Sequence, residues 1–216
     1  MKTLTHKYTI PCYDTDASWR LKPTSFMNMA QEAALGGWTA YSKIDRFLFL
    51  PSQSLSMAAT TFVGQNLGAG RLDRVRTGVR QGLIMLVAAS ELVGIVTFIF
   101  APQFIGLFSP SAAVVAYGVR HARTVTLFYC LLGFAHGAAS VLRGAGHAVS
   151  PMVVFMSVWC LFRISYVTVM VQLFHDITAV LTAYPVTWAI SSILFALLLK
   201  FSHWMTPSRW GKKPQL

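Results

Sequence analysis

The sequence predicts an all-α membrane protein of about five transmembrane helices, preceded by a short segment outside the membrane. Its 216 residues are 55% hydrophobic and 12% charged, whereas soluble globular domains carry about 25% charged residues. The mean hydropathy is +0.54. From residue 81 onward, long apolar runs with no more than one charge each follow one another. About 20 apolar residues cross a hydrocarbon core of about 30 Å, so each run predicts a transmembrane helix.

Residues 1–37 differ from the rest of the chain, because charged and polar side chains are spread through them. They lack the long apolar core of a signal peptide. A short strand is predicted near residues 8–13, and a helix is predicted to begin around Thr24 or Ser25. About 37 residues cannot bury a hydrophobic core alone, so we expect no independent domain here.

The first predicted span covers residues 38–67 and is more polar than the others. Pro51 lies inside it and is expected to kink or interrupt the helix. Gln53, Gln65 and Asn66 are candidates for a substrate or ion pathway. The alternative is that these side chains bond to neighbouring helices, which is the commoner role of polar residues in membrane spans.

The remaining predicted spans are built around the long apolar runs and cover about residues 81–108, 119–142, 149–174 and 177–200. Glu91 and Arg163 are each the single charge of a long apolar run. A charge at the bilayer centre costs about 2.5–3.5 kcal/mol, so each needs a partner or a wet cavity. We expect both to face the interior at depths that let them pair, either to couple transport or only to hold helices together. His136 can change its charge near neutral pH and is a further pathway candidate, although a packing role is commoner.

The basic residues between the spans predict the orientation of the chain. Nine of them lie on one side, in the loop 68–81, at Arg143 and in the tail 200–216, and two lie in the opposite connection 109–123. The positive-inside rule therefore places the C-terminus and the basic tail 205–216 in the cytoplasm. Because the charge lies at helix ends, the net charge of +11 does not predict a nucleic-acid partner. The glycines of the loop lack the Gly-Lys-Ser/Thr ending of a phosphate loop.

Three motifs in the predicted spans resemble the multidrug and toxic compound extrusion (MATE) transporters. They are FLPSQSLSMAATTFVGQNLGAGRLDRVRTG, SVLRGAGHAVSPM and AYPVTWAISSILFALLL, similar to parts of the eighth, tenth and twelfth helices of that family. The match runs from Trp38 to Trp204. The motif residues with an expected structural role are Pro51, Gly64, Gly68, Gly70, Arg71, Arg143, Gly144, Gly146, Pro185 and Trp188.

This resemblance implies a fold of twelve helices in two six-helix lobes, of which the chain supplies the eighth to the twelfth. It implies export of cationic amphipathic compounds across the inner (plasma) membrane, coupled to the entry of protons or sodium ions. No enzymatic activity is expected, and no cofactor besides the coupling ion. The implied partners are the lipid bilayer, small cationic organic substrates, and a second lobe or a second copy of the chain. We expect the chain alone not to transport, because half of the cavity is absent.

The segment HKYTIPCYDTDASWRLKPTSFMNMAQEAA resembles the first strand and the start of the central helix of bacterial acyl-carrier-protein thioesterases, which have a hotdog fold. This resemblance implies a chimera with its junction near residues 36–39. The alternative function is a thioesterase fragment with an incidental membrane tail. Residues after 37 lack the period-two alternation of further strands, and no catalytic residue of that family is carried over. Cys12, Cys130 and Cys160 have no metal-ligand spacing, so no metal site is expected.

Overall fold

The described residues form helices and the turns between them. In the computed structural model these residues are 23–174, 178–202 and 204–205. The helices in chain order are α1 (Pro23–Gly68), α2 (Leu72–Gly106), α3 (Ala112–Thr126), α4 (Tyr129–Gly144), α5 (Val149–Phe155), the π-helical η2 (Met156–Phe162), α6 (Arg163–Phe174) and α7 (Thr178–Phe201). The all-α fold class is therefore confirmed for this part of the chain. The strand predicted near residues 8–13 and most of the predicted tail lie outside the described residues.

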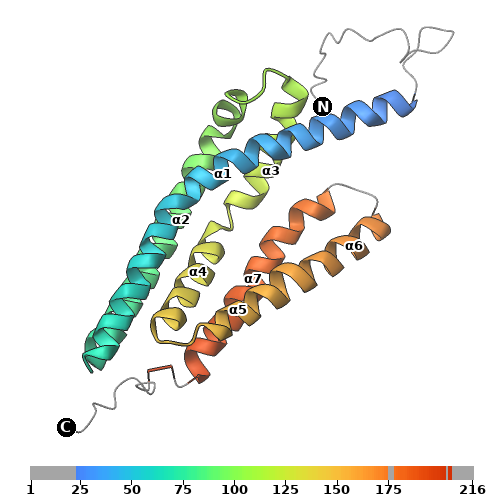
Figure 1. Cartoon of the computed structure of the whole chain (residues 1–216). Helices are drawn as coiled ribbons and strands as arrows, with labels where there is room; N and C mark the ends of the chain where they lie inside the picture. Colours follow the sequence, from blue (N-terminus) through green and yellow to red (C-terminus); the bar gives the residue numbers. More distant parts are fainter. Residues whose placement is uncertain (1–22, 175–177, 203, 206–216) are drawn as a thin grey trace, which may run out of the picture.

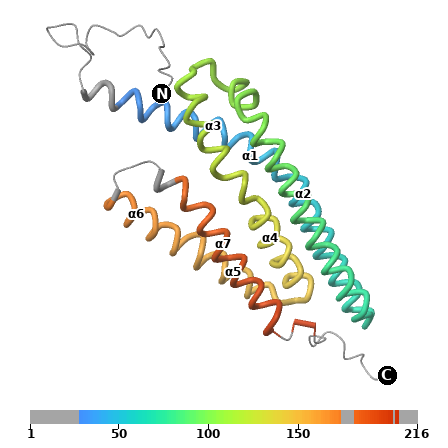
Figure 2. Tube along the Cα trace, turned by 180° about the vertical axis from the view of Figure 1, so that it is seen from behind, coloured from blue at the N-terminus to red at the C-terminus, as the bar shows by residue number. Residues whose placement is uncertain are grey.

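The helices form an elongated bundle in which α1 lies beside α2 and beside the segment formed by α3 and α4 (Figure 1). α7 packs against α4, and α5, η2 and α6 run alongside α7 (Figure 2). α6 and η2 contact α7 and each other, and η2 also contacts α5, so α7 is the main link between the segment α5–η2–α6 and the rest of the bundle.

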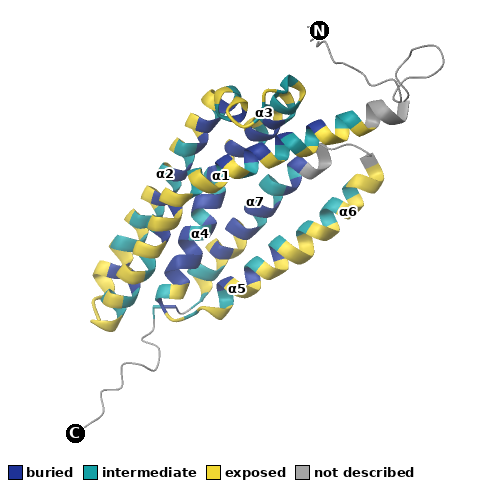
Figure 3. Ribbon diagram, turned by 45° about the horizontal axis from the view of Figure 1, so that its top comes forward, coloured by how far each residue is buried: buried dark blue, intermediate teal, exposed yellow. Residues whose placement is uncertain are grey.

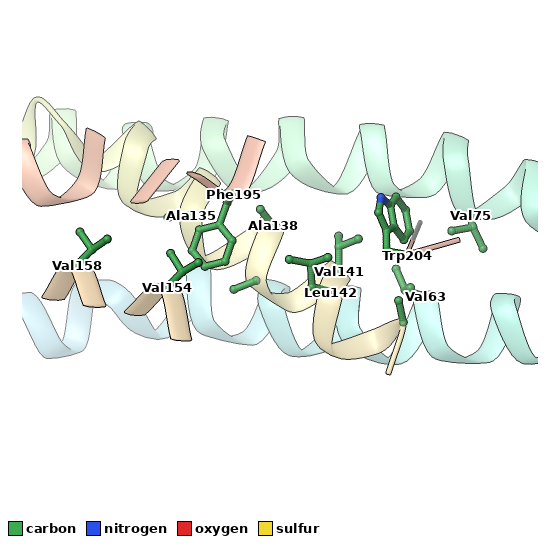
Figure 4. Close-up of a cluster of buried hydrophobic side chains, with 12 residues drawn as sticks. Val63, Val75, Ala135, Ala138, Val141, Leu142, Val154, Val158, Phe195 and Trp204 are labelled. Atoms are coloured by element: carbon green, nitrogen blue, oxygen red, sulfur yellow. The ribbon is translucent and has the colours of Figure 1, made fainter. Parts of the chain in front are cut away.

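Two clusters of buried apolar side chains hold the bundle together. The first joins α1, α2, α4, α5 and α7, and Figure 4 shows Leu142 of α4 and Phe195 of α7 among its members. The second joins the other ends of α1, α2 and α7 to α3, and it includes Tyr41, Ile105 and Trp188. α1, α2, α4 and α7 contribute to both clusters, and α4 is the central helix because it contacts α1, α2, α5 and α7.

Three helices among the described residues are long and apolar enough to cross a membrane, namely Leu72–Gly106, Val149–Leu173 and Leu181–Phe201. Ala112–Thr126 and Tyr129–Gly144 add a fourth if these two helices, bent by 55°, form one broken span. α1 is not among the helices that meet this measure, so the span predicted over 38–67 stays a prediction. The outward side of α6 is exposed and apolar, as a lipid-facing surface requires (Figure 3).

α1 is one continuous helix of 46 residues, and it changes direction along its length (Figure 1). It begins at Pro23, as expected from the predicted start near Thr24, because proline suits the first helical position. Pro51 lies inside α1 without interrupting it. The helix also runs through residues 36–39, so the predicted junction does not coincide with the end of an element. A separate origin for residues 1–37 stays a prediction.

The connection between α1 and α2 is shorter than the predicted loop 68–81. Only residues 69–71 lie between the two helices, and α2 begins at Leu72. Gly70 adopts φ +69°, a conformation that favours glycine, and the Arg71 N–H bonds to the Asn66 carbonyl at 2.9 Å. The basic residues after Arg71 therefore lie on the first turns of α2, where arginine is a good helix former and Asp73 suits the N-terminus.

The span predicted over 119–142 is broken in the structure. α3 ends at Thr126, α4 begins at Tyr129, and Leu127 and Phe128 form the turn between them. α3 already begins at Ala112, so the predicted connection 109–123 is reduced to residues 107–111. The span predicted over 149–174 is helical throughout, with η2 between α5 and α6.

Candidate functional site

A carboxylate and two tyrosine hydroxyls meet where α1 faces the start of α4. The Tyr129 hydroxyl donates a hydrogen bond to Oδ1 of Asp45. The hydroxyls of Tyr41 and Tyr129 lie 2.8 Å apart, and the Tyr41 hydroxyl is 3.4 Å from the same Asp45 oxygen. Tyr41 and Tyr129 are 5% and 3% exposed, so a buried polar network surrounds one carboxylate. A carboxylate in apolar surroundings needs such donors.

Aromatic rings surround this network of Tyr41, Asp45 and Tyr129. The ring of His121, on α3, lies 4.5 Å from that of Tyr41. The ring of Trp188, on α7, lies 5.9 Å from that of Tyr129. His121 is 3% exposed, and its Nδ1 has no hydrogen-bond partner among the described residues. The structure therefore places a half-buried carboxylate beside an aromatic cluster contributed by α1, α3, α4 and α7.

Arg163 lies against the same aromatic cluster. Its guanidinium carbon is 4.4 Å from the ring centre of Tyr184 and 5.3 Å from that of Trp159. Its Nη2 donates a hydrogen bond of 2.6 Å to the Thr187 hydroxyl. Cation–π contacts and this hydrogen bond thus supply the partners that a charge in an apolar span requires.

Glu91 has a different partner. Its Oε2 accepts a 2.9 Å hydrogen bond from the backbone N–H of Cys130, the second residue of α4. The break before α4 leaves N–H groups of its first turn without intrahelical partners, and a carboxylate there also suits the helix dipole. The expected pair between Glu91 and Arg163 is therefore not formed: Glu91 bonds to the start of α4 and Arg163 to Thr187, while Arg163 Nε has no hydrogen-bond partner among the described residues.

A polar cleft of about 460 Å³ between α1 and α4 brings together three of the residues singled out in the sequence: Gln53, His136 and Arg143. The His136 ring lies 4.8 Å from Phe49 and 5.3 Å from Phe155. Arg143 Nη2 donates to the Ser140 hydroxyl at 3.0 Å. We call this feature the α1–α4 cleft; its other lining residues are Ser56, Met57, Thr60 and Thr61.

Gln65 and Asn66 do not line the α1–α4 cleft. The Asn66 side-chain amide donates to the Phe62 carbonyl of its own helix at 2.8 Å, and Gln65 is exposed. The alternative role, a bond from these two side chains to a neighbouring helix, is not seen among the described residues.

Some of the family-motif residues lie at a helix contact or in a turn. A Cβ atom on Gly144 would lie 2.5 Å from the Thr60 carbonyl oxygen, so glycine lets α4 approach α1 closely. Gly146 follows α4 with φ +85°. Trp188 is buried, and Pro185 lies inside α7. The remaining motif residues lie on α1 or in the turn after it: Pro51, Gly64, Gly68, Gly70 and Arg71.

The sequence did not single out Asp45, Tyr41 or Tyr129. One signal was present, because Tyr41 and Asp45 are four residues apart and therefore share a face of α1. Among the described residues, no group of three His, Cys, Asp or Glu side chains is placed to hold a metal ion.

The sequence profile of the family described as MatE matches residues 18–169. The chain belongs to the MatE family. It is 27% identical over 200 residues to the "Probable multidrug resistance protein NorM" of Thermotoga maritima, covering 89% of this chain and 42% of NorM. It is 25% identical over 177 residues to the "Probable multidrug resistance protein YoeA" of Bacillus subtilis, covering 79% of this chain and 37% of YoeA. The chain thus spans less than half the length of these curated relatives.

Two solved transporter structures share the fold of this chain. The MATE transporter ClbM, in complex with Rb⁺, matches with a TM-score of 0.72 at 21% identity, over 80% of this chain and 41% of ClbM. A MOP superfamily transporter from Pyrococcus furiosus matches with a TM-score of 0.72 at 14% identity, over 86% of this chain and 46% of that one. These likenesses establish the fold.

The comparisons give no support to the thioesterase resemblance. The MatE match begins at residue 18, inside the segment that carries that resemblance. From residue 23 that segment is part of α1, and Gly37 in this helix packs directly on Gly118 of α3. The described part of the segment is therefore a piece of the MatE bundle.

Proposed function

We propose that this chain forms one half of a multidrug efflux transporter, which exports cationic amphipathic compounds while protons or sodium ions enter the cell. Membership of the MatE family and the names of the relatives support the class of activity. The observation in this chain that carries the proposal is the carboxylate of Asp45 beside an aromatic cluster. Aromatic faces and one carboxylate suit an organic cation.

Asp45 is the residue at which the substrate and the coupling ion compete in this proposal. Tyr129 and Tyr41 fix the carboxylate in one orientation through the hydrogen bonds described above. A proton or a sodium ion that neutralises the carboxylate removes its attraction for an organic cation. The Asp45 carboxylate holds either the organic cation or the coupling ion, but not both at once. This exclusion is the simplest way to link export of the cation to entry of the proton or sodium ion.

One half of a carrier does not transport in this proposal. The chain covers 42% of NorM, and alternating access in many carriers requires one repeat to rock against another. The second half is either another polypeptide or a second copy of this chain. We place the complete carrier in the inner (plasma) membrane, with the C-terminus of this chain in the cytoplasm.

The binding site is tested with tetraphenylphosphonium, an aromatic cation, and the purified chain in nanodiscs of phosphatidylcholine. We expect Asp45→Asn to weaken binding about tenfold or more, because the carboxylate is lost while the shape is kept. The matched control is Asp73→Asn, since Asp73 is exposed on the first turn of α2. Equal affinity of the Asp45→Asn variant and the unaltered chain would contradict the site.

The transport step is tested by ethidium accumulation in an efflux-deficient bacterial strain that produces the chain. We expect no decrease in accumulation when the chain is produced alone. Export by the chain alone, as a monomer, would overturn the proposal that it is one half of a carrier. Export by a cross-linkable dimer would identify the second half as another copy.

A further inference from the structure

The α1–α4 cleft has the opposite charge to the site around Asp45. Of the residues that line it, Arg143 carries the only formal charge, and none is acidic. We infer that this cleft binds the anionic headgroup of an amphiphile, a phosphate or a carboxylate. This binding site is separate from the cation site of the proposed function and does not depend on it.

Arg143 supplies the donors for an anion. Its side chain is exposed, and its hydrogen-bond partner among the described residues is the Ser140 hydroxyl, at 3.0 Å from Nη2. Ser140 in turn donates to the His136 carbonyl at 2.7 Å, so its hydroxyl proton is engaged and its lone pair faces Arg143. This arrangement orients the guanidinium and leaves further N–H groups for a planar, two-point contact with phosphate or carboxylate oxygens.

Ser56 provides a second, independent sign of a ligand. It is 5% exposed, and its Oγ has no hydrogen-bond partner among the described residues. The other hydroxyls of the cleft are engaged, since Thr60 bonds to the Ser56 and Ser140 carbonyls and Thr61 bonds to the Met57 carbonyl. A buried hydroxyl without a partner is unfavourable unless something else accepts its proton. An anionic oxygen in the cleft fulfils this requirement.

The shape of the cleft suits an amphiphile better than a free anion. Arg143 lies at the end of α4, one residue before the helix ends, and His136 lies seven residues earlier, about 10 Å along the axis. His136 is packed against the rings of Phe49, Phe155 and Trp159. A headgroup at Arg143 therefore places its attached carbon chain along Met57 and the His136 ring, which line the cleft. A volume of about 460 Å³ accommodates a headgroup and several methylene groups.

The test uses the full chain purified in a neutral maltoside detergent, with dodecyl phosphate as the probe. We expect dodecyl phosphate to bind and inorganic phosphate to bind at least tenfold more weakly, because the latter lacks the apolar part. Arg143→Gln should weaken binding about tenfold, and Ser56→Ala about threefold. Arg71→Gln is the matched control, since Arg71 is an exposed arginine outside the cleft, and it should leave the affinity unchanged.

A second arm identifies the source of the headgroup. Native mass spectrometry of the chain from nanodiscs containing phosphatidylglycerol shows whether the lipid is retained, and retention that is lost in Arg143→Gln assigns the cleft to a membrane lipid. Binding of dodecyl phosphate without lipid retention assigns it to a free amphiphile. Equal binding by Arg143→Gln and the unaltered chain, or an equal loss in Arg71→Gln, would overturn the inference.

Two further measurements keep the result interpretable. Arg143→Lys retains the charge, and its affinity for dodecyl phosphate should be within about threefold of that of the unaltered chain. If Arg143→Gln does not fold, Arg143→Lys and Ser56→Ala remain as the test. Tetraphenylphosphonium binding should be unchanged in Arg143→Gln. Loss of both ligands in that variant with normal helical content by circular dichroism would contradict two separate sites.

Discussion

At the residue scale, Tyr129 is both the first residue of α4 and the donor of a hydrogen bond to the carboxylate of Asp45. Its hydroxyl lies 2.8 Å from the Tyr41 hydroxyl, which completes a group of three polar side chains beside an apolar cluster. The neighbouring residue, Cys130, gives its backbone N–H to Glu91. Two carboxylates, one on α1 and one on α2, therefore bond to the first turn of α4. Removal of either carboxylate takes away one of the contacts that hold α4 in place after the break.

The Tyr129 hydroxyl can be tested directly. Tyr129→Phe removes the donor to Asp45 without changing the ring, and we expect a loss of about 1–2 kcal/mol in the free energy of unfolding. The measurement is unfolding of the purified chain in mixed micelles, followed by circular dichroism. Tyr117→Phe is the control, because no hydrogen bond of its hydroxyl is seen among the described residues. Equal losses in the two variants would contradict the role given to Tyr129.

At the scale of elements, the approach of α1 to α4 decides where both sites lie. Gly144 allows the contact near the end of α4, and the Asp45 network joins the same two helices near its beginning. The α1–α4 cleft opens along this same pair of helices. The Asp45 network and the cleft are thus built on one helix pair, so a change in its spacing affects both.

Gly144→Ala tests this helix contact. The added methyl group would lie 2.5 Å from the Thr60 carbonyl oxygen, and backbone atoms cannot yield cheaply. We expect a loss of about 1–3 kcal/mol in the free energy of unfolding. Gly68→Ala is the matched control at another glycine of the same motifs, since nothing lies within 4 Å of its Cβ position. It should leave stability unchanged within about 0.5 kcal/mol, measured by the same unfolding experiment.

At the scale of the whole molecule, the sequence predicted what depends on composition and missed what depends on contacts between helices. Long apolar runs identify α2, α5–α6 and α7, because burial in lipid requires such runs. The break at Leu127 and Phe128 carries no glycine or proline, so no local signal marks it. Asp45 lies between Lys43 and Arg46, a pattern typical of an interfacial turn, and only folding brings it to Tyr129.

The orientation of the molecule is open to a direct test. Because the basic side chains after Arg71 lie on the first turns of α2, we expect this end and the C-terminus to face the cytoplasm. A green fluorescent protein fused after Leu216 should fluoresce, and alkaline phosphatase fused there should be inactive. Phosphatase fused after Pro110, between α2 and α3, should be active. The reverse pattern of activities would invert the assignment.

The length of α4 has a consequence for how two ligands interact. Tyr129 and Arg143 stand fourteen positions apart on this helix, which is about 21 Å. A compound of ordinary drug size cannot reach from one to the other. If tetraphenylphosphonium and inorganic phosphate displace each other, their competition must therefore be transmitted by movement of the protein, and it cannot reflect overlap of the two molecules.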